Sequence, residues 1–371
     1  MTPADPTSRH LFRRYPALVG KLPWLPLADL PSPVEPLTKL GAAAGLRDLW
    51  VKRDDRNSPL YGGNKPRKFE FVFAEALALG RQEVVTLGGA GSNHAAAVCL
   101  YSQKLNLRAT LAVGPQPVLS YVRRNILVDH ACGAHFLVGE NDASAFLKAA
   151  AHCLGPRLRG RTPPYFMYYG ASSPTGNAGF VNAALELADQ IKTGELPMPR
   201  RVFTATGSCG THAGLLVGFR AAGLPIEVVG VSVVPKTLTN RYVVALHANR
   251  TVRFLRGLDP SFPALRVRPA EVRLLEDFVG GQYGRPTPEG KAAIRLMQET
   301  EGLTLDPTYT GKAFAGMLAF LRENKLAGEP ALFWLTLNSR PLDRWIPSTV
   351  PDDLPPALRR YFTEPLYDPE L

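Results

Sequence analysis

The chain has 371 residues, of which 45% are hydrophobic and 20% are charged, a composition typical of a globular protein in water. Its 43 basic and 32 acidic side chains give a formal net charge of +11, but the basic residues are dispersed and no nucleic-acid-binding motif is present. The sequence therefore argues against a nucleic-acid partner and favours small anionic ligands.

The cysteines and the hydropathy of the chain indicate the cellular compartment in which the protein works. The cysteines lie far apart without a CxxC pair, so neither a zinc site nor a disulfide framework is predicted. The chain has no apolar run of about 18 residues that could span a membrane, and its first residues lack the apolar core of a signal peptide. The sequence predicts a cytoplasmic protein with reduced thiols, no metal and no membrane partner. The four thiols are Cys99, Cys132, Cys153 and Cys209.

Strand and helix patterns alternate between two proline-rich ends, residues 16–36 and 347–369, which are predicted to be extended arms. Repeated strand–turn–helix units predict an α/β fold with mainly parallel, doubly wound sheets. Ligands in such folds bind beyond the carboxyl ends of the strands. The predicted strands cover residues 83–87, 108–113, 134–138, 165–168, 201–205, 227–231 and 331–337. The predicted helices cover residues 66–79, 93–104, 211–222, 288–300 and 312–322.

Lys65 lies in the segment Tyr61-Gly-Gly-Asn-Lys-Pro-Arg-Lys68. Asn64 and Pro66 are typical of a helix start, so an ordinary turn into a helix is one interpretation. Two further cations within three residues disfavour the ammonium form of Lys65 and favour its neutral amine. Because a neutral amine attacks a carbonyl to form a Schiff base, the other interpretation is a lysine that carries an aldehyde cofactor.

Two glycine-rich turns each connect a predicted strand to a predicted helix. In the first, residues 88–94, Ser92 is the predicted N-cap and the free amides can attract an anion such as a substrate carboxylate. The second, residues 206–212, offers amides and hydroxyls that suit a phosphate, without the ending of a P-loop or the GxGxxG pattern of a dinucleotide site. For both turns an ordinary tight connector remains the alternative.

Two tyrosines occur in glycine-bearing loops late in the chain, Tyr283 in residues 280–287 and Tyr309 in residues 306–312. A phenol can stack on a ring or relay a proton. Each tyrosine alone is compatible with an ordinary loop residue, but together with the two turns they indicate a binding site for a ring.

Taken together, these motifs resemble the D-cysteine desulfhydrase and 1-aminocyclopropane-1-carboxylate deaminase family. The resemblance implies pyridoxal 5'-phosphate as the cofactor and two doubly wound α/β domains of the tryptophan-synthase-β type, which is fold type II of these enzymes. It implies a large cofactor-binding domain formed by residues 1–67 and 190–371, and a smaller inserted α/β domain of residues 68–189. It also implies a homodimer. The matching segments are residues 52–55, 62–68, 92–94, 207–211, 283 and 309–312.

The resemblance assigns catalytic roles to five residues. Lys65 would carry the cofactor as a Schiff base. Ser92 and His94 would face the carboxylate and Cα of an amino-acid substrate. Tyr283 would lie near the reacting centre, and Tyr309 would stack on or flank the pyridine ring.

The resemblance also implies a set of cofactor contacts. Asn93 would bond to the ring hydroxyl of the cofactor, and Thr310 would place a hydroxyl near the pyridine nitrogen. Thr336, at the end of the last predicted strand, belongs to the same site. The phosphate would be held by Gly207, Ser208, Cys209, Gly210 and Thr211.

Three positions favour the desulfhydrase side of the family. The deaminases carry a glutamine, a glutamate and a leucine where this chain has His94, Thr310 and Thr336. The predicted reaction is therefore β-elimination of D-cysteine to pyruvate, ammonia and hydrogen sulfide.

The chain also departs from the family pattern. It has Gly91 in place of a usual glutamine, Ser173 in place of a usual asparagine, and residues 334–338 in place of a His-Thr-Gly-Gly type of turn. Two alternatives follow. One is a related lyase or deaminase that acts on 1-aminocyclopropane-1-carboxylate, cysteate or another β-substituted amino acid, and the other is a catalytically silent homologue that binds the cofactor.

Overall fold

The computed structural model describes residues 5–367, which pack as two compact units. Unit 1 combines Met1–Ala74 with Ala171–Ser339, and unit 2 combines Glu75–Gly170 with Arg340–Leu371. One boundary falls inside helix α3 (Asn64–Ala78), which begins in unit 1 and ends in unit 2.

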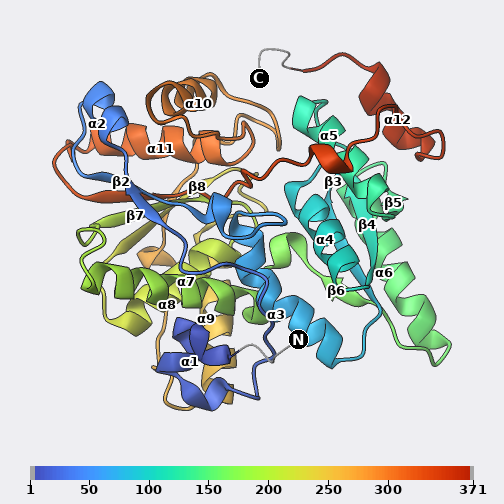
Figure 1. The fold of residues 1–371 in the computed structure, drawn as a ribbon, viewed down its shortest axis with the longest axis horizontal. Helices are drawn as coiled ribbons and strands as arrows, with labels where there is room; N and C mark the ends of the chain where they lie inside the picture. The colour runs from blue at the N-terminus through green and yellow to red at the C-terminus, as the bar shows by residue number, and fades with distance from the viewer. Residues whose placement is uncertain (1–4, 368–371) are drawn as a thin grey trace. The chain divides into compact units, whose positions relative to one another are not determined.

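Unit 1 is built on a six-stranded sheet (Figure 1). The first strand pairs antiparallel with its neighbour, and all the other pairs are parallel. Neighbouring residues of one strand point to opposite faces, so Val202 and Phe203 enter different hydrophobic clusters. In order across the sheet the strands are β1 (Val34–Pro36), β2 (Leu49–Lys52), β10 (Ala331–Trp334), β7 (Arg201–Thr206), β8 (Glu227–Ser232) and β9 (Arg273–Leu275).

Helices cover both faces of this sheet. One cluster of buried side chains joins the strands to α1 (His10–Arg14), α7 (Pro174–Lys192), α8 (Gly210–Ala222) and α9 (Arg241–Leu258). The cluster on the other face involves α2 (Thr38–Ala44), α10 (Pro288–Glu301) and α11 (Thr310–Glu323). Short 3-10 helices are η1 (Pro6–Ser8), η2 (Pro16–Leu18), η3 (Asp54–Arg56), η4 (Tyr169–Ala171), η5 (Pro269–Glu271) and η6 (Asp343–Trp345).

Unit 2 contains a four-stranded parallel sheet with helices on both faces. One buried cluster joins Leu111 and Val113 to the helices that follow the Ser92 turn and to the C-terminal helix, and the other joins Val85 and Leu87 to Ala149 of α6. Its strands in order are β5 (His135–Val138), β4 (Arg108–Gly114), β3 (Glu83–Gly89) and β6 (Tyr165–Met167). Its helices are α4 (Asn93–Lys104), α5 (Ser120–Ala131), α6 (Asp142–Leu158) and α12 (Pro356–Thr363).

The division into units differs from the predicted one. The predicted smaller domain ran from residue 68 to residue 189, but α7 packs in unit 1, where Phe180 and Val181 are fully buried. The predicted larger domain included the whole C-terminus, but residues 340–367 pack on unit 2 through Leu354 and Leu358. Both differences arise from packing between segments far apart in the sequence.

The α/β class with doubly wound, mainly parallel sheets is confirmed, and most predicted elements are present. Two expectations were wrong in detail. The last strand ends at Trp334 and not at residue 337, because the following residues turn to bond with the chain before α3. The proline-rich ends are not purely extended, since the first contains the 3-10 helix η2 and the second contains α12. No helix in residues 5–367 is long and apolar enough to cross a membrane.

Candidate active site

The Lys65 turn requires glycine at two positions. A Cβ atom on Gly62 would lie 2.0 Å from the carbonyl oxygen of Asp55, and one on Gly63 would lie 2.4 Å from the carbonyl oxygen of Thr336. Gly63 also has φ of +89°, a conformation that other residues rarely adopt. The glycine pair therefore lets the chain pass between η3 and the end of β10 and deliver Lys65 to the first turn of α3.

The Lys65 amine lies beside the start of α8. Its Nζ donates a hydrogen bond to Asn64 Oδ1 at 2.6 Å, and Asn64 Nδ2 donates to Thr211 Oγ1 at 3.3 Å. Burial lowers the pKa of Lys65 to about 8, and the negative charge of Asp306 opposes that shift. A substantial fraction of the amine is therefore neutral near neutral pH, as a nucleophile requires.

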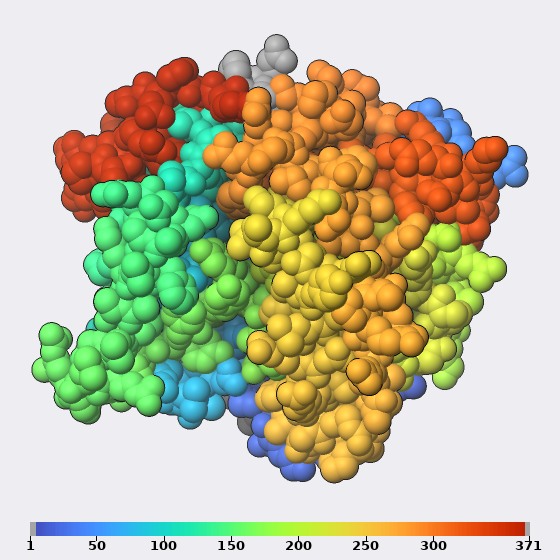
Figure 2. Space-filling model, turned by 180° about the vertical axis from the view of Figure 1, so that it is seen from behind, coloured from blue at the N-terminus to red at the C-terminus, as the bar shows by residue number. Residues whose placement is uncertain are grey.

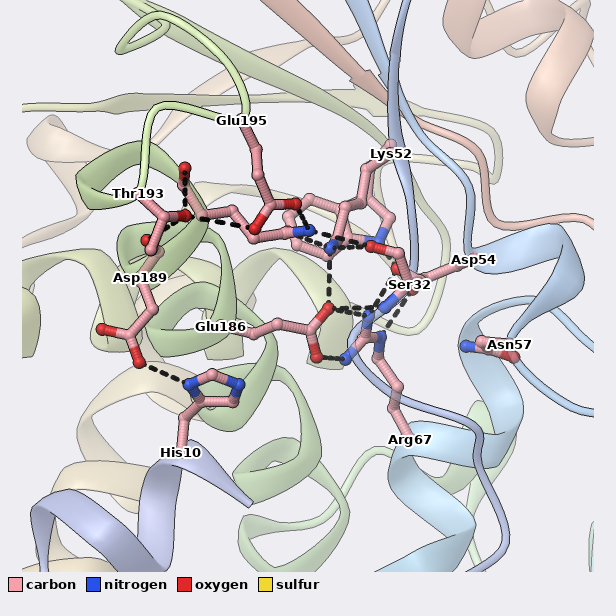
Figure 3. Close-up of polar contacts among 12 residues, drawn as sticks. His10, Ser32, Lys52, Asp54, Asn57, Arg67, Glu186, Asp189, Thr193 and Glu195 are labelled. Carbon is pink, nitrogen blue, oxygen red and sulfur yellow. Dashed lines mark hydrogen bonds and ion pairs between the residues drawn. The ribbon is translucent and has the colours of Figure 1, made fainter. Parts of the chain in front are cut away.

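The cause of this low pKa differs from the predicted one. The sequence interpretation attributed it to the neighbouring cations, but burial is the dominant cause. Arg67 Nε and Nη2 donate to both carboxylate oxygens of Asp54 at 2.8 and 2.7 Å, and Arg67 also makes two hydrogen bonds of 2.9 Å to Glu186. Figure 3 shows Arg67 between the two carboxylates. Its charge is thus neutralised locally.

Arg67 belongs to a buried network of four charges. The Lys52 amine contacts Glu186 at 2.6 Å, so two cations face two anions, and all four side chains are inaccessible to water. These contacts raise the pKa of Arg67 above its usual range and hold the pKa of Glu186 well below its usual range. Because the four residues come from β2, η3, α3 and α7, the network fixes the elements around the Lys65 turn.

Residues 334–338, a departure from the family pattern, also support this turn. Trp334 Nε1 donates to Asp54 Oδ2 at 2.6 Å, which joins the end of β10 to the charge network. The Thr336 carbonyl accepts from the Asn64 amide at 3.1 Å, and Asn338 Oδ1 accepts from the Gly62 amide at 2.7 Å. The substituted segment is therefore built into the site, and Thr336 meets the Lys65 turn through its carbonyl group.

The predicted phosphate turn, residues 207–211, follows β7 and starts α8. Cys209 adopts a left-handed conformation with φ of +65° and precedes the first helical residue, Gly210. The first amides of a helix have no carbonyl partner inside it and carry partial positive charge, so this turn can receive an anion. The hydroxyl of Thr239 donates to the Gly207 carbonyl and holds the turn.

Lys68 is a candidate site residue that the sequence interpretation used only as a neighbouring charge. It is buried, and its Nζ donates to Ser172 Oγ at 3.1 Å, which in turn donates to Ser208 Oγ at 2.8 Å in the phosphate turn. A Cβ atom on Gly210 would lie 2.7 Å from this Nζ. Burial, followed by the charge of Lys65, lowers the pKa of Lys68 well below its usual range. Its position three residues after Lys65, on the same face of the helix, could have indicated that Lys68 belongs to the site.

The two predicted tyrosines meet beside the same turn. Their hydroxyl oxygens are 2.5 Å apart, so one phenol donates to the other, and their ring centroids are 6.1 Å apart at an interplanar angle of 69°. A Cβ atom on Gly207 would lie 3.7 Å from Cε1 of Tyr309. Tyr283, Tyr309 and the phosphate turn are thus neighbours in unit 1.

Thr310 is buried and takes part in a tight local turn. Its hydroxyl donates to Asp306 Oδ2 at 2.7 Å and accepts from the Asp306 amide at 2.8 Å. The amide of Tyr309 donates to the other carboxylate oxygen at 2.7 Å. The single hydroxyl proton of Thr310 is therefore used in the hydrogen bond to Asp306. Toward a ligand, Thr310 Oγ1 can act only as a hydrogen-bond acceptor.

The remaining predicted residues form the turn before α4 in unit 2. Ser92 Oγ accepts from the amides of His94 and Ala95 at 3.2 and 3.4 Å, so the predicted N-cap is confirmed. His94 is buried, and its Nε2 lies 2.9 Å from the hydroxyl of Thr86, whose proton goes to the Met167 carbonyl. Nε2 therefore carries the imidazole proton, and Nδ1 is the basic nitrogen.

Asn93 is held by a second asparagine. Asn125 Nδ2 donates to Asn93 Oδ1 at 2.8 Å and to the Gly91 carbonyl at 2.9 Å. The Nδ2 group of Asn93 is then the donor that faces away from this contact. At Gly91, another departure from the family pattern, a Cβ atom would lie 2.4 Å from Cα of Val122, so no larger side chain fits.

The third departure, Ser173, also has a local role. It is the N-cap of α7, and its Oγ accepts from the Gly176 amide at 3.1 Å. The predicted site residues thus fall into two groups, Ser92–His94 in unit 2 and all the others in unit 1.

Comparison with known proteins identifies the family. The model of the family described as "Pyridoxal-phosphate dependent enzyme" matches residues 25–336. The chain belongs to this family. The predicted cofactor, pyridoxal 5'-phosphate, is thereby confirmed. The predicted enzyme class is also confirmed: the protein is a lyase of the desulfhydrase and deaminase group.

Three relatives of this pyridoxal-phosphate-dependent enzyme share 34% identity with it. A putative 1-aminocyclopropane-1-carboxylate deaminase of Pyrococcus abyssi aligns over 85% of this chain and 92% of its own length. The nocardicin C-9' epimerase of Nocardia uniformis aligns over 87% and 94%. A D-cysteine desulfhydrase of Yersinia enterocolitica aligns over 85% and 93%.

Solved structures agree with this assignment. A crystal structure of a 1-aminocyclopropane-1-carboxylate deaminase homologue has a TM-score of 0.75 at 30% identity and covers 90% of this chain and 95% of its own. A threonine deaminase of Solanum lycopersicum, at 19% identity and a TM-score of 0.56, covers 92% and 87% and shares the fold. The predicted fold type II is confirmed.

The residues present fit the cofactor. A partly neutral lysine, a helix start with free amides and a buried lysine of low pKa lie together in unit 1, as an aldehyde that carries a phosphate requires. Among residues 5–367 no group of histidine, cysteine and carboxylate side chains could hold a metal ion.

Proposed function

We propose that this enzyme eliminates the thiol of D-cysteine and releases pyruvate, ammonia and hydrogen sulfide. The observation that carries the chemistry is the Lys65 amine, with its pKa of about 8, beside the start of α8. The similarity to the D-cysteine desulfhydrase of Yersinia enterocolitica supports the substrate, as do His94 and Thr310 at the positions that separate the two sides of the family.

In this proposal Lys65 would be the residue that holds the aldehyde of the cofactor. The amides of residues 207–211 and the ammonium of Lys68 would hold its phosphate, since an anion would favour the charged form of that lysine. Tyr309, Thr310 and Thr336 would bind its ring. When bound, the cofactor supplies an electron sink that stabilises negative charge at the substrate Cα.

The protein side chains move the protons. The neutral amine of Lys65 could accept the Cα proton. The hydrogen-bonded phenols of Tyr283 and Tyr309 would form a second route for a proton: one phenol would take up a proton and pass its own along their 2.5 Å contact, and the other would release its proton to water or a base. Ser92 and the first amides of α4 would bind the substrate carboxylate, and Asn93 would donate to the ring hydroxyl.

His94 has a defined protonation state in this scheme. Because Thr86 fixes the proton on Nε2, Nδ1 is the nitrogen that can accept a proton or a hydrogen bond near Cα. Nδ1 could take up the proton released from Cα and then pass it to the departing thiolate, which must be protonated nearby.

The test is a comparison of substrates on one enzyme preparation. We expect purified enzyme to show an absorption band from the bound cofactor and to release pyruvate and sulfide from D-cysteine faster than from L-cysteine. Lys65→Ala should lose both the covalent attachment and the turnover. A bound cofactor that D-cysteine leaves unchanged would contradict the proposed substrate, and the absence of any cofactor binding would contradict the proposed site.

A second candidate is deamination of 1-aminocyclopropane-1-carboxylate. It is favoured by the relative of that name in Pyrococcus abyssi and by the structural similarity to a deaminase homologue. Release of 2-oxobutanoate and ammonia from this substrate, with no pyruvate from D-cysteine, would select it. Cysteate and other β-substituted alanines are tested in parallel, and turnover of none of them would select a silent cofactor-binding homologue.

We also propose that the enzyme is a homodimer, a state implied by the family resemblance. Light scattering on purified protein should give twice the mass of one 40.4 kDa chain. A mass of one chain at all concentrations would contradict this proposal.

A further inference from the structure

The C-terminal arm, residues 340–367, packs on unit 2 and lies outside residues 25–336, which the family model matches. The arm adds Leu354, and its helix α12 adds Leu358 and Tyr361, to the hydrophobic cluster that contains the buried face of α5. These three side chains are at most 1% exposed. Figures 1 and 2 show the arm in red against the teal residues of the same unit. The arm is therefore an integral part of unit 2.

Polar contacts fix the arm to α5 and to the loop before it. The phenol oxygen of Tyr361 accepts a hydrogen bond from the Gln116 amide at 3.0 Å. The guanidinium of Arg123, in the first turn of α5, donates to the carbonyl oxygens of Tyr361 and Glu364, both at 2.6 Å. Three hydrogen bonds thus set the position of this loop and helix relative to the arm.

The loop that carries Gln116 and helix α5 also form hydrogen bonds with the turn before α4. Gln116, which is 5% exposed, accepts a hydrogen bond from the Gly91 amide through its side-chain oxygen at 3.3 Å. Asn125, which is fully buried, donates to the Gly91 carbonyl and to the side chain of Asn93. The amide and the carbonyl group of Gly91 and the side chain of Asn93 are therefore held by Gln116 and by α5. The arm contacts both Gln116 and α5.

We propose that the C-terminal arm is a positioning element for the candidate substrate turn, residues 91–94, and that it acts through Gln116 and Asn125. The inference rests on the proposed function only in assigning this turn to the amino-acid substrate. The arm touches no reacting group in this account. It sets the direction of the Asn93 side chain and of the first turn of α4, which determine how tightly a carboxylate is bound.

The test removes one atom of the arm. Tyr361→Phe keeps the ring in the hydrophobic cluster but deletes the oxygen that accepts from Gln116. We expect KM for the productive amino acid to rise about fivefold, with kcat and cofactor affinity within about twofold of the wild type. Amide hydrogen exchange in a peptide covering residues 88–95 should become faster. Tyr168→Phe, which removes a hydroxyl from an exposed tyrosine of unit 2, is the matched control and should change neither quantity.

A second variant tests the route. Gln116→Met keeps the side-chain length and loses the acceptor for the Gly91 amide, so adding Tyr361→Phe to it should have little further effect on KM or on exchange. Additive effects, or a Tyr361→Phe variant with wild-type KM and wild-type exchange in residues 88–95, would overturn the proposal. If the wild type turned over no amino acid, the proposed function would fail, and the exchange measurement would still decide the role of the arm.

Discussion

At the scale of single residues, the reactivity of Lys65 depends on its pKa of about 8. Below that value the amine is protonated and cannot attack an aldehyde, so the rate of cofactor uptake by the apoenzyme should fall about tenfold for each pH unit below 8 and level off above it. An unburied lysine would level off only near its ordinary pKa of about 10.4. Rapid-mixing absorbance measurements from about pH 6 to about pH 10 check this midpoint.

Asn64 offers a matched variant for the same measurement. Its Oδ1 accepts from Lys65 Nζ at 2.6 Å, so Asn64→Asp places a carboxylate against the amine with little change in shape. The negative charge favours the ammonium form, and the midpoint of the uptake rate should move upward by about one pH unit or more. A midpoint that is the same in both proteins would mean that a group other than Lys65 controls uptake.

Lys68 gives a second prediction at this scale. Because it reaches the phosphate turn through Ser172 and Ser208, Lys68→Met should weaken the affinity for pyridoxal 5'-phosphate by about tenfold to a hundredfold, the loss of one partly buried charge contact. Affinity for pyridoxal, which lacks the phosphate, should change little. Equilibrium titration of both aldehydes measures the difference, and an equal loss for the two would argue for a general structural defect.

At the scale of elements, the buried charges of Arg67, Glu186, Asp54 and Lys52 hold four segments around the Lys65 turn. Glu186→Gln leaves two cations against one anion, and we expect a loss of about 3–5 kcal/mol in the free energy of unfolding. Urea denaturation of the apoenzyme measures it. Glu195→Gln is the control, since its exposed carboxylate reaches the network only through Gln190 and should cost less than about 1 kcal/mol.

The same variant should change the dependence of stability on pH. The pKa of Glu186 is lowered in the folded protein, so its stabilising contribution is present above the unfolded pKa of about 4.3 and is lost as the pH falls through the acid range. The wild type should therefore lose more stability than Glu186→Gln between about pH 5 and about pH 3. Parallel curves for the two proteins would place the titrating group elsewhere.

The elements also show how much the sequence could predict. The helix over residues 93–104 and its Ser92 cap were predicted with their observed bounds, because the cap and the flanking glycines are local signals. Helix α7 was missed, although Ser173 and Pro174 form a good helix start, because it is buried on nearly every side and polar residues such as Asn182 and Glu186 interrupt its apolar pattern. The charge network was not predictable, since Asp54 and Glu186 meet only in the folded chain.

The candidate site likewise has parts that local motifs predict and parts that only long-range contacts form. Lys65, the phosphate turn and the two tyrosines are carried by short motifs, and the structure brings them together in unit 1. The C-terminal arm, by contrast, is linked to the Ser92 turn through Gln116 and through α5, which carries Asn125, and these two residues have no local motif of their own. Contacts that support a site from distant segments are visible in the packing of the folded chain and cannot be predicted from the spacing of residues in the sequence.

At the scale of the whole molecule, the net charge of +11 should attract an anionic ligand before any specific contact forms. The association rate of pyridoxal 5'-phosphate with the apoenzyme should therefore fall several-fold between about 20 mM and about 500 mM sodium chloride, because salt shortens the range of the attraction. Pyridoxal, without the phosphate, should associate at a rate that salt hardly changes. If both aldehydes showed the same salt dependence, the dispersed basic surface would have no role in capture, and the local charge at Lys68 and α8 would account for phosphate binding alone.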